Sequence, residues 1–467
     1  MITRDMIVPP PKGTDLICRH IAETSFEDLS EENLELFKLR LFDMIGCIFG
    51  GACVEEDQFF ADIFMKWGGA PEAPLFTRKG RLPLNNAVMM NCLLARANDY
   101  GSMLYHIFGD RVASHYGESL IPLGLTLADV FETSGKEFVT SNIVAEDAIG
   151  RLLYTLPKRF PTDMQLGSSI CTALASRYYK LSAEQIKVAL SYAATNTSDP
   201  ANAYYDYCQE FKYWNAENAR MGIMACEIAR SGMWDGMEDP FFGNLGLITN
   251  QIKPTGELPP LYEKAFEGLG EVYFTECSFK RGPGGIPTTA ASECGTLLNE
   301  KLTDIYGKVD PDAISRVRVL SSIKRKYYYD LEFPKRNQSN ALFSYRFAAV
   351  CSLLHHRRKV ADIQTKAIRN DPRLIELVDN ATMESYDNET EAIKLIVEMK
   401  DGSSYEQECD YLLMDEMPGK ELLLEKFWDQ FNAFGKLPKS VGEKILECTD
   451  KIETLSDMRE LTSLLVL

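Results

Sequence analysis

The chain has 467 residues. A single hydrophobic core rarely serves a chain of this length, so we expect at least two domains. Its 50 Lys and Arg stand against 68 Asp and Glu, and the formal net charge of −18 argues against nucleic acid or an anionic membrane as a partner. A small anionic substrate would require a local cluster of Lys and Arg inside a cleft, where the dielectric is lower.

Twelve cysteines are spread along the chain without a C-x-x-C pair or a Cys/His group at zinc spacing. This usage is typical of reduced thiols in a reducing compartment. No segment reaches the ~18 uninterrupted apolar residues of a membrane span, and the N-terminus lacks the apolar stretch of a secretory signal. We therefore expect a cytoplasmic protein without a membrane partner.

Helical periodicity begins near residue 30 and dominates the first half of the chain. In residues 30–51 the apolar side chains recur at helical spacing behind a candidate cap at Ser30, and the glycine pair at 50 and 51 is expected to end the helix. Further amphipathic segments cover residues 84–97, 118–132, 167–195 and 215–232. The first half is therefore expected to be essentially all-α.

The pattern changes after about residue 275. Residues 314–320, ISRVRVL, alternate like a strand. Residues 391–412 place Ile393 and three further apolar side chains on one face, before an Asp401-Gly402 turn and a returning strand. Helical periodicity returns beyond about residue 415.

These patterns predict a mainly α fold with an inserted α+β unit. We expect a large helical domain from residues 1–276, a smaller α+β lid domain from residues 277–414, and C-terminal helices from residues 415–467 that pack back on the helical domain. The sequence contains no P-loop, HExxH, GxSxG or Rossmann fingerprint, so nucleotide, zincin and serine-hydrolase functions lose their main support.

The stretch NDYGSMLYHIFGDRVASHYGES, residues 98–119, holds two of the five histidines. Asp99 follows one predicted helix and His115 precedes the next, and the glycines between them allow an irregular loop that could face a cleft. Histidine can move protons near neutral pH, and a neighbouring carboxylate can orient it. The alternative is that His106 and His115 are capping or buried hydrogen-bonding residues.

A second stretch, CSFKRGPGGIPTTAASE, begins at residue 277. Lys280 and Arg281 supply positive charge, the run through Gly284 and Gly285 exposes backbone N–H groups, and a helix is expected to begin near Pro287. Together these features predict a carboxylate site at a helix N-terminus. The alternative is a connecting loop with a solvated basic pair.

The ordered series of segments resembles the MmgE/PrpD family, whose members include 2-methylcitrate dehydratase, cis-aconitate decarboxylase and iminodisuccinate epimerase. The resemblance is carried by LRLFDMIGCIFGGA, NNAVMMNCLLARANDY, SHYGESLIPLGLTLAD, FPTDMQLGSSICTALASRYYKLSAEQIKVALSYAAT, FKRGPGGIPTTAA and NALFSYRFAAV. It implies a helical domain, an α/β lid domain, a homodimer, and chemistry on small di- or tricarboxylates without metal or organic cofactor.

The resemblance also implies roles for single residues. Asp99 matches the first acid of the family's D-F-D-D-T loop, His115 the histidine of its H-P-S motif, and Lys280 the lysine that opens its K-x-x-P stretch. Lys212, which lies near the start of a predicted helix, matches a further active-site lysine, whereas His106 lies in an apparent insertion and is an accessory candidate.

The chain also departs from the family pattern. Ser102 and Met103 replace a later acid and threonine, and a histidine expected shortly after Lys280 is absent. Phe347 stands where several members carry a tyrosine, and Arg346 beside it is a candidate cation for the substrate.

From these observations we expect a cofactor-independent lyase, first of all a dehydratase of a small hydroxy-di- or tricarboxylate. Asp99, His115, Lys212 and Lys280 are the expected catalytic residues. The expected substrate-binding residues are Arg281, Gly284, Gly285, His106 and Arg346. A decarboxylase or an epimerase on a similar acid is the alternative within the same chemistry, and a catalytically silent carboxylate-binding protein is the alternative from another class.

Overall fold

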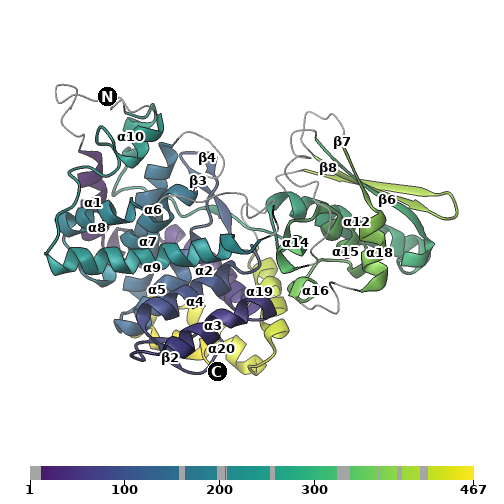
Figure 1. The fold of residues 1–467 in the computed structure, drawn as a ribbon, viewed down its shortest axis with the longest axis horizontal. Helices are drawn as coiled ribbons and strands as arrows, with labels where there is room; N and C mark the ends of the chain where they lie inside the picture. Colours follow the sequence, from purple (N-terminus) through teal and green to yellow (C-terminus); the bar gives the residue numbers. More distant parts are fainter. Residues whose placement is uncertain are drawn as a thin grey trace.

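The computed structural model describes residues 12–156, 163–196, 206, 208–252, 258–322, 337–364, 369, 371–385, 392–410 and 419–467. As predicted, the protein is mainly α. In the first half, long helices pack around one another in one lobe (Figure 1). These helices are α1 (Gly13–Glu23), α2 (Glu31–Gly51), α3 (Gln58–Trp67), α4 (Leu84–Arg96), α5 (Gly117–Val130), α6 (Gly135–Tyr154), α7 (Asp163–Tyr178), α8 (Ala183–Ala193) and α9 (Glu210–Ser231), followed by the short α10 (Leu247–Ile252) and α11 (Tyr262–Ala265).

Helix α2 confirms the prediction for residues 30–51 at both of its ends. The Ser30 hydroxyl accepts a hydrogen bond from the backbone N–H of Asn33 at 3.1 Å, so the predicted cap is present. The helix ends at Gly51, and packing explains this glycine: a Cβ there would lie 1.9 Å from the carbonyl oxygen of Leu94 on α4. The glycine therefore permits a close approach between α2 and α4.

The stretch between Asp99 and His115 is not the irregular loop that we expected. Residues Met103–Ile107 form strand β3 and Asp110–Val112 form β4, and the two pair as an antiparallel hairpin. Strand β5 (Cys277–Ser278) pairs with the other edge of β3. This small sheet joins the loop at the end of α4 to the chain segment that leads into residues 279–285. A further short pair, β1 (Ala73–Pro74) and β2 (Arg81–Leu82), precedes α4.

The second lobe contains helices packed against one four-stranded sheet (Figure 1). The sheet has the order β7-β6-β8-β9, with β6 and β7 parallel and the other pairs antiparallel. Along β8 every second residue is buried, as predicted, so one face of the sheet lies on the helices. The elements are α12 (Ile286–Tyr306), β6 (Ile314–Ser321), α14 (Gln338–Phe343), α15 (Tyr345–His355), α16 (Val360–Gln364), α18 (Pro372–Asn380), β7 (Thr382–Ser385), β8 (Ile393–Met399) and β9 (Ser404–Cys409).

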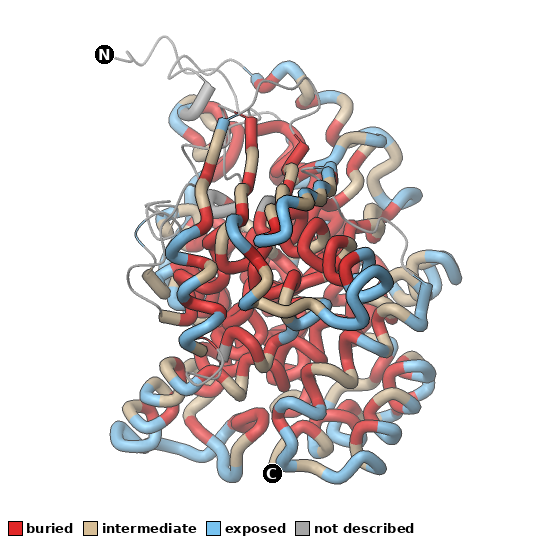
Figure 2. Tube along the Cα trace, turned by 90° about the vertical axis from the view of Figure 1, so that its right-hand side faces the viewer, coloured by how far each residue is buried: buried red, intermediate tan, exposed pale blue. Residues whose placement is uncertain are grey.

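The chain then returns to the first lobe. Helices α19 (Lys420–Phe434), α20 (Lys439–Asp450) and α21 (Arg459–Thr462) contribute side chains to the same hydrophobic core as α2 and α4, and α19 packs against α2. A second core holds the helices and the inner sheet face of the other lobe. Figure 2 shows that buried residues fill the interior of the molecule and that exposed ones line its outer loops. The expected domain boundary at residue 276 remains a prediction, and that at residue 414 lies outside the described residues.

Two further sequence-based expectations concern the membrane and the cysteines. Among the described residues, no helix has both the length and the apolar character needed to cross a membrane. All twelve cysteines are free thiols, and ten of them are buried.

Candidate active site

The site begins where α4 ends. Asp99 lies three residues beyond Arg96, the last residue of α4, and its backbone adopts a left-handed conformation with φ of 45°. Asp tolerates this conformation better than most residues, and here it turns the chain sharply toward β3. The Asp99 side chain is only 3% exposed, so its carboxylate requires partners within the protein.

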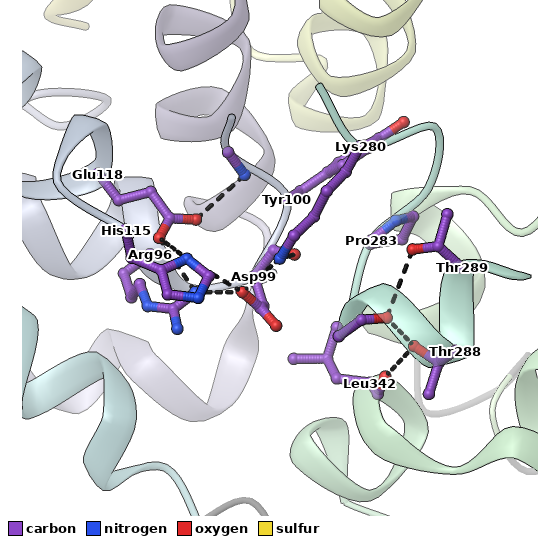
Figure 3. A network of polar contacts seen from close by, with 12 residues as sticks. Arg96, Asp99, Tyr100, His115, Glu118, Lys280, Pro283, Thr288, Thr289 and Leu342 are labelled. Atoms are coloured by element: carbon purple, nitrogen blue, oxygen red, sulfur yellow. Dashed lines mark hydrogen bonds and ion pairs between the residues drawn. The ribbon is translucent and has the colours of Figure 1, made fainter. Parts of the chain in front are cut away.

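Two buried cations hold the Asp99 carboxylate (Figure 3). Arg96 contacts it from the same helix end, and Lys280 Nζ lies 2.7 Å from Asp99 Oδ1. The same ammonium donates a hydrogen bond to the backbone oxygen of Asp99 at 2.9 Å. Lys280 is 2% exposed, so the alternative of a solvated basic pair does not apply to it.

His115 completes the cluster from the other side (Figure 3). Its Nδ1 lies 3.2 Å from Glu118 Oε2 and 3.7 Å from Asp99 Oδ1, so Glu118 is the nearer carboxylate. Arg96 also contacts Glu118, at 3.0 Å, and the second Glu118 oxygen accepts a hydrogen bond from the backbone N–H of Gly101. The side chain of His115 is 14% exposed, whereas both carboxylates are buried. The imidazole is therefore the more accessible group.

The charges in the cluster set its protonation. Burial alone would raise the pKa of Asp99, but Arg96 and Lys280, with a contribution from His115, outweigh it and hold this pKa well below its usual range. Burial would also raise the pKa of Glu118, yet Arg96 and His115 lower it. Burial lowers the pKa of Lys280 against the opposing effect of Asp99. Both carboxylates are therefore charged at neutral pH.

Asp99, His115 and Glu118 are also the side chains of this cluster that could hold a metal ion, because their ligand atoms lie within 4.8 Å of one another. However, Arg96 already contacts both carboxylates, and the Lys280 ammonium contacts one of them. A divalent cation would have to stand beside these two positive charges. The geometry therefore favours a carboxylate pair neutralised by protein cations.

The Gly-rich segment after Lys280 connects this cluster to the second lobe. The backbone N–H of Gly284 donates to the carbonyl oxygens of Asn98 and Asp99, at 3.0 and 3.1 Å. Gly284 has a φ of +104°, and a Cβ there would lie 2.3 Å from the oxygen of Leu342, so its role in the structure is a backbone one. Gly285 is the N-cap of α12, and the helix begins at Ile286 beside the predicted Pro287.

Arg281 lies beside this segment and is only partly buried. Its Nη1 lies 3.3 Å from Glu293 Oε1, and its backbone oxygen accepts a hydrogen bond from the Tyr100 hydroxyl. The position of Arg281 next to Lys280 and before the α12 N-terminus agrees with a carboxylate site at this helix end, which stays a prediction.

Lys212 lies outside the Asp99 cluster. Its buried Nζ is 2.8 Å from Asp57 Oδ2 and donates a hydrogen bond to Gln338 Oε1 at 2.8 Å. The Gln338 amide in turn donates to the backbone oxygen of Ala97, at 2.8 Å. Lys212 is therefore connected to the turn that carries Asp99 through one intervening side chain, at a junction of the two lobes.

Two further predicted substrate-binding residues are His106 and Arg346. His106, on β3, has its Nδ1 3.1 Å from Glu276 Oε1 and its Nε2 3.2 Å from the hydroxyl of Ser278. Arg346 is half-buried in the first turn of α15, beside the fully buried Phe347. Their role in binding substrate remains a prediction.

Sequence reasoning missed Arg96 and Glu118. Each had a signal in its spacing, because Arg96 precedes Asp99 by three residues and Glu118 follows His115 by three. Helix ends place residues at this spacing side by side. Gln338, which joins Lys212 to the Asp99 turn, had no such local signal because it lies more than a hundred residues away in the sequence.

Comparison with known proteins identifies the family of the chain. The family model described as the MmgE/PrpD N-terminal domain matches residues 15–254. No curated protein sequence matches the chain. The matched residues span more than half of the chain and include Asp99, His115, Glu118 and Lys212, and the chain belongs to the MmgE/PrpD family.

Proposed function

We propose that this protein is a cofactor-independent lyase that removes water from a small hydroxy-di- or tricarboxylate. Membership of the MmgE/PrpD family supports a dehydratase-type lyase in general. The observation that carries the proposal is the Asp99 cluster, in which a partly exposed histidine faces two buried carboxylates that stay charged. Such an imidazole is oriented by its carboxylate neighbours, which suits histidine for proton transfer.

In the proposed reaction His115 is the base. Glu118 faces Nδ1, so Nε2 takes the proton from the carbon next to a substrate carboxylate. The electron pair of that C–H bond forms the C=C bond, and the C–O bond to the neighbouring hydroxyl group breaks. The departing hydroxide takes the proton back from the imidazolium and leaves as water, which balances the step. Asp99 is not the proton acceptor in this scheme, because Arg96 and Lys280 hold its pKa well below its usual range and so make it a weak base.

The substrate carboxylates are proposed to bind at the positive side of the cluster. Lys280, Arg281 and the N-terminus of α12 at Gly285 provide the cationic and N–H groups for them. Gly284 is less suited to this task, because its N–H already holds the Asn98–Asp99 backbone. Lys212 is a positioning residue in the proposal, since it holds Gln338 against the turn that leads to Asp99.

The test is turnover of a panel of hydroxy-di- and tricarboxylates by the full chain, read by mass spectrometry in normal and deuterated water. Loss of one water from a panel member, with solvent deuterium in recovered substrate, is the expected result. Loss of carbon dioxide would make the protein a decarboxylase, and inversion at one carbon without a mass change would make it an epimerase. Carboxylate binding without any turnover would contradict the enzyme and leave a silent binding protein.

A further inference from the structure

A cavity lies beside the Gly-rich segment, against α19. It has a volume of about 420 Å³ and is bounded by α19, by the turn between α15 and α16, and by residues 279–281. Neither Asp99, His115 nor Glu118 lines it. We call it the α19 cavity. Its size is that of a small-molecule site rather than a packing defect.

The α19 cavity is rich in positive charge. Its lining includes Lys280, Arg281, Arg357, Arg358, Lys359 and Lys426, against the two carboxylates of Glu425 and Asp429. In a chain with a net charge of −18 this local excess is against the overall trend. A cleft lined by one sign of charge concentrates ions of the opposite sign.

Four of these cations have carboxylate partners. The pairs are Lys280 with Asp99, Arg281 with Glu293, Arg357 with Glu425, and Lys426 with Asp43. Asp429 is partly buried, and burial raises its pKa against the opposing effects of the Val360 backbone and Lys359. Arg358 and Lys359 then account for the positive charge of the cavity, with Lys359 exposed at its rim.

Arg358 is the unusual member of the set. It is 1% exposed, and its guanidinium donates to the oxygens of Pro283, Ala341 and Thr288, all of which are neutral. Among the described residues no carboxylate pairs with it, and its Nε has no hydrogen-bond partner. Burial lowers the pKa of Arg358 to about 10. A buried cation with only neutral partners is costly unless an anion approaches it.

The remaining lining is apolar and aromatic. Phe279, Leu422 and Trp428 lie in the wall, together with the ring of Tyr100, which Lys426 covers at 3.8 Å. We propose that the α19 cavity is a binding site for an organic anion, with a carboxylate or phosphate group at Arg358 and Lys359 and an apolar or ring-shaped body against Trp428 and Phe279. The α19 cavity shares Lys280 and Arg281 with the proposed substrate site, but neither Asp99 nor His115 lines it.

The site is connected to the candidate active site through the same arginine. The Arg358 guanidinium donates a hydrogen bond to the carbonyl oxygen of Pro283. Gly284, which follows Pro283, donates its N–H to the carbonyl oxygens of Asn98 and Asp99. An anion that draws the guanidinium toward itself acts on the segment that carries Lys280. Occupancy of the α19 cavity is therefore expected to change the affinity of the Asp99 cluster for its own ligand, and the reverse.

The test is isothermal calorimetry on the full chain with phenyl phosphate, phenylacetate and inorganic phosphate. Lys359→Glu reverses one charge at the rim and should weaken binding of the phenyl compounds about tenfold, as expected for loss of a charge-assisted contact. Asp429→Asn keeps the side-chain shape, removes a negative charge and should tighten binding. Lys451→Glu at the end of α20 is the matched control, because this lysine is exposed and does not line the cavity, and it should leave the affinity unchanged.

The three probes separate the parts of the proposal. Tighter binding of phenyl phosphate or of phenylacetate identifies the anionic group, and weaker binding of inorganic phosphate supports the apolar contact. His115→Gln should bind the phenyl compounds as the wild type does, which distinguishes this site from the proposed active site. Absence of binding by both phenyl compounds, or equal affinities in the Lys359, Asp429 and Lys451 variants, would overturn the proposal.

Discussion

His115 is the residue on which the proposed chemistry depends, because its imidazole is the most exposed proton acceptor of the Asp99 cluster. His115→Gln keeps a polar planar side chain of similar size but cannot take a proton. We expect the variant to keep the fold while turnover of the substrate falls by ~10²–10⁴-fold, the usual contribution of a general base. The measurement is the turnover rate of purified wild type and variant on the substrate found in the panel.

A second histidine provides the control for this experiment. His356 is exposed in the second lobe, where its Nε2 lies 3.0 Å from Glu300 Oε1. His356→Gln should turn over substrate at the wild-type rate. If His115→Gln did so as well, the imidazole would be a structural group, and the base would have to be sought among the other members of the site.

Lys280 contributes to stability as well as to the proposed binding of carboxylates. Its ammonium is buried against Asp99, so Lys280→Ala would leave that carboxylate with Arg96 as its remaining close cation. We expect a loss of about 3 kcal/mol in the free energy of unfolding, the lower end for a broken buried pair. Urea denaturation would measure it. The neighbouring Arg281→Ala, which breaks a partly exposed pair with Glu293, should cost less than about 1 kcal/mol.

The stability contribution of Asp99 should depend on pH. Because its pKa is lower in the folded than in the unfolded chain, the carboxylate stabilises the protein above its ordinary value of 3.8, and this contribution is lost as the pH falls through the folded pKa. Asp99→Asn should therefore be less stable than wild type at about pH 7, and the difference should shrink below about pH 4. Urea denaturation at several pH values would test this, and a difference that stayed constant to low pH would contradict it.

Some residues of the site could be predicted from their neighbours in the sequence, and others could not. Asp99, His115 and Lys280, predicted from a polar loop and from the family resemblance, meet in one cluster. Spacing alone could not show that Lys280 is buried, because its burial depends on the packing of Asp99 and Arg96 around it. The contact of Lys212 with Asp57 joins segments 155 residues apart, which no periodicity reports.

At the scale of elements, the contact of α2 with α4 can be tested at Gly51. A methyl group there would overlap the carbonyl of Leu94, which is backbone and cannot rotate away. Gly51→Ala should therefore cost about 1–3 kcal/mol in the free energy of unfolding, as overpacking of a core does. Gly117, the first residue of α5, is the control, since its Cβ would meet only ordinary contacts at 3.4 Å or more. Equal stability of the two variants in urea would contradict the close packing.

The helices were the more predictable elements for a physical reason. A long amphipathic helix repeats its signal over several turns, as α2, α4 and α9 do, whereas the β3–β4 hairpin consists of strands of five and three residues. Its glycines suggested an irregular loop, but Phe108 and Gly109 have positive φ values and form a turn between paired strands. The strand β7 was not predicted, because its pairing with β6 is set by distant residues.

At the scale of the whole molecule, two cores meet where the candidate sites lie. Phe211, at the start of α9, belongs to the second core and also receives the guanidinium of Arg96 over its ring, at 4.9 Å. Its ring centroid lies 5.3 Å from that of Phe343 in α14. The Asp99 cluster therefore lies next to residues of both cores.

One face of the first lobe is more apolar than its own packing requires. Side chains on α3 and at the start of α9 are exposed, including Phe59 at 52%, Trp67 at 68% and Tyr213 at 46%. The rings of Phe60 and Tyr213 lie 6.2 Å apart, so the two helices form one continuous surface, the α3–α9 face. Exposed apolar surface of this kind usually marks an interface.

We propose that the α3–α9 face is the contact of a homodimer, the assembly that the family resemblance implies. A stable interface buries about 1,200–2,000 Å² and has aromatic side chains at its centre, like those exposed on the α3–α9 face. Sedimentation velocity should therefore give the mass of two chains. Trp67→Arg should shift the protein toward monomer. Trp234 provides the control, because it is exposed to a similar degree, at 62%. It lies beyond the C-terminal end of the 22-residue helix α9, about 33 Å from the start of that helix. Trp234→Arg should keep the dimer, and a dimer lost only with Trp234→Arg would place the interface at that end instead.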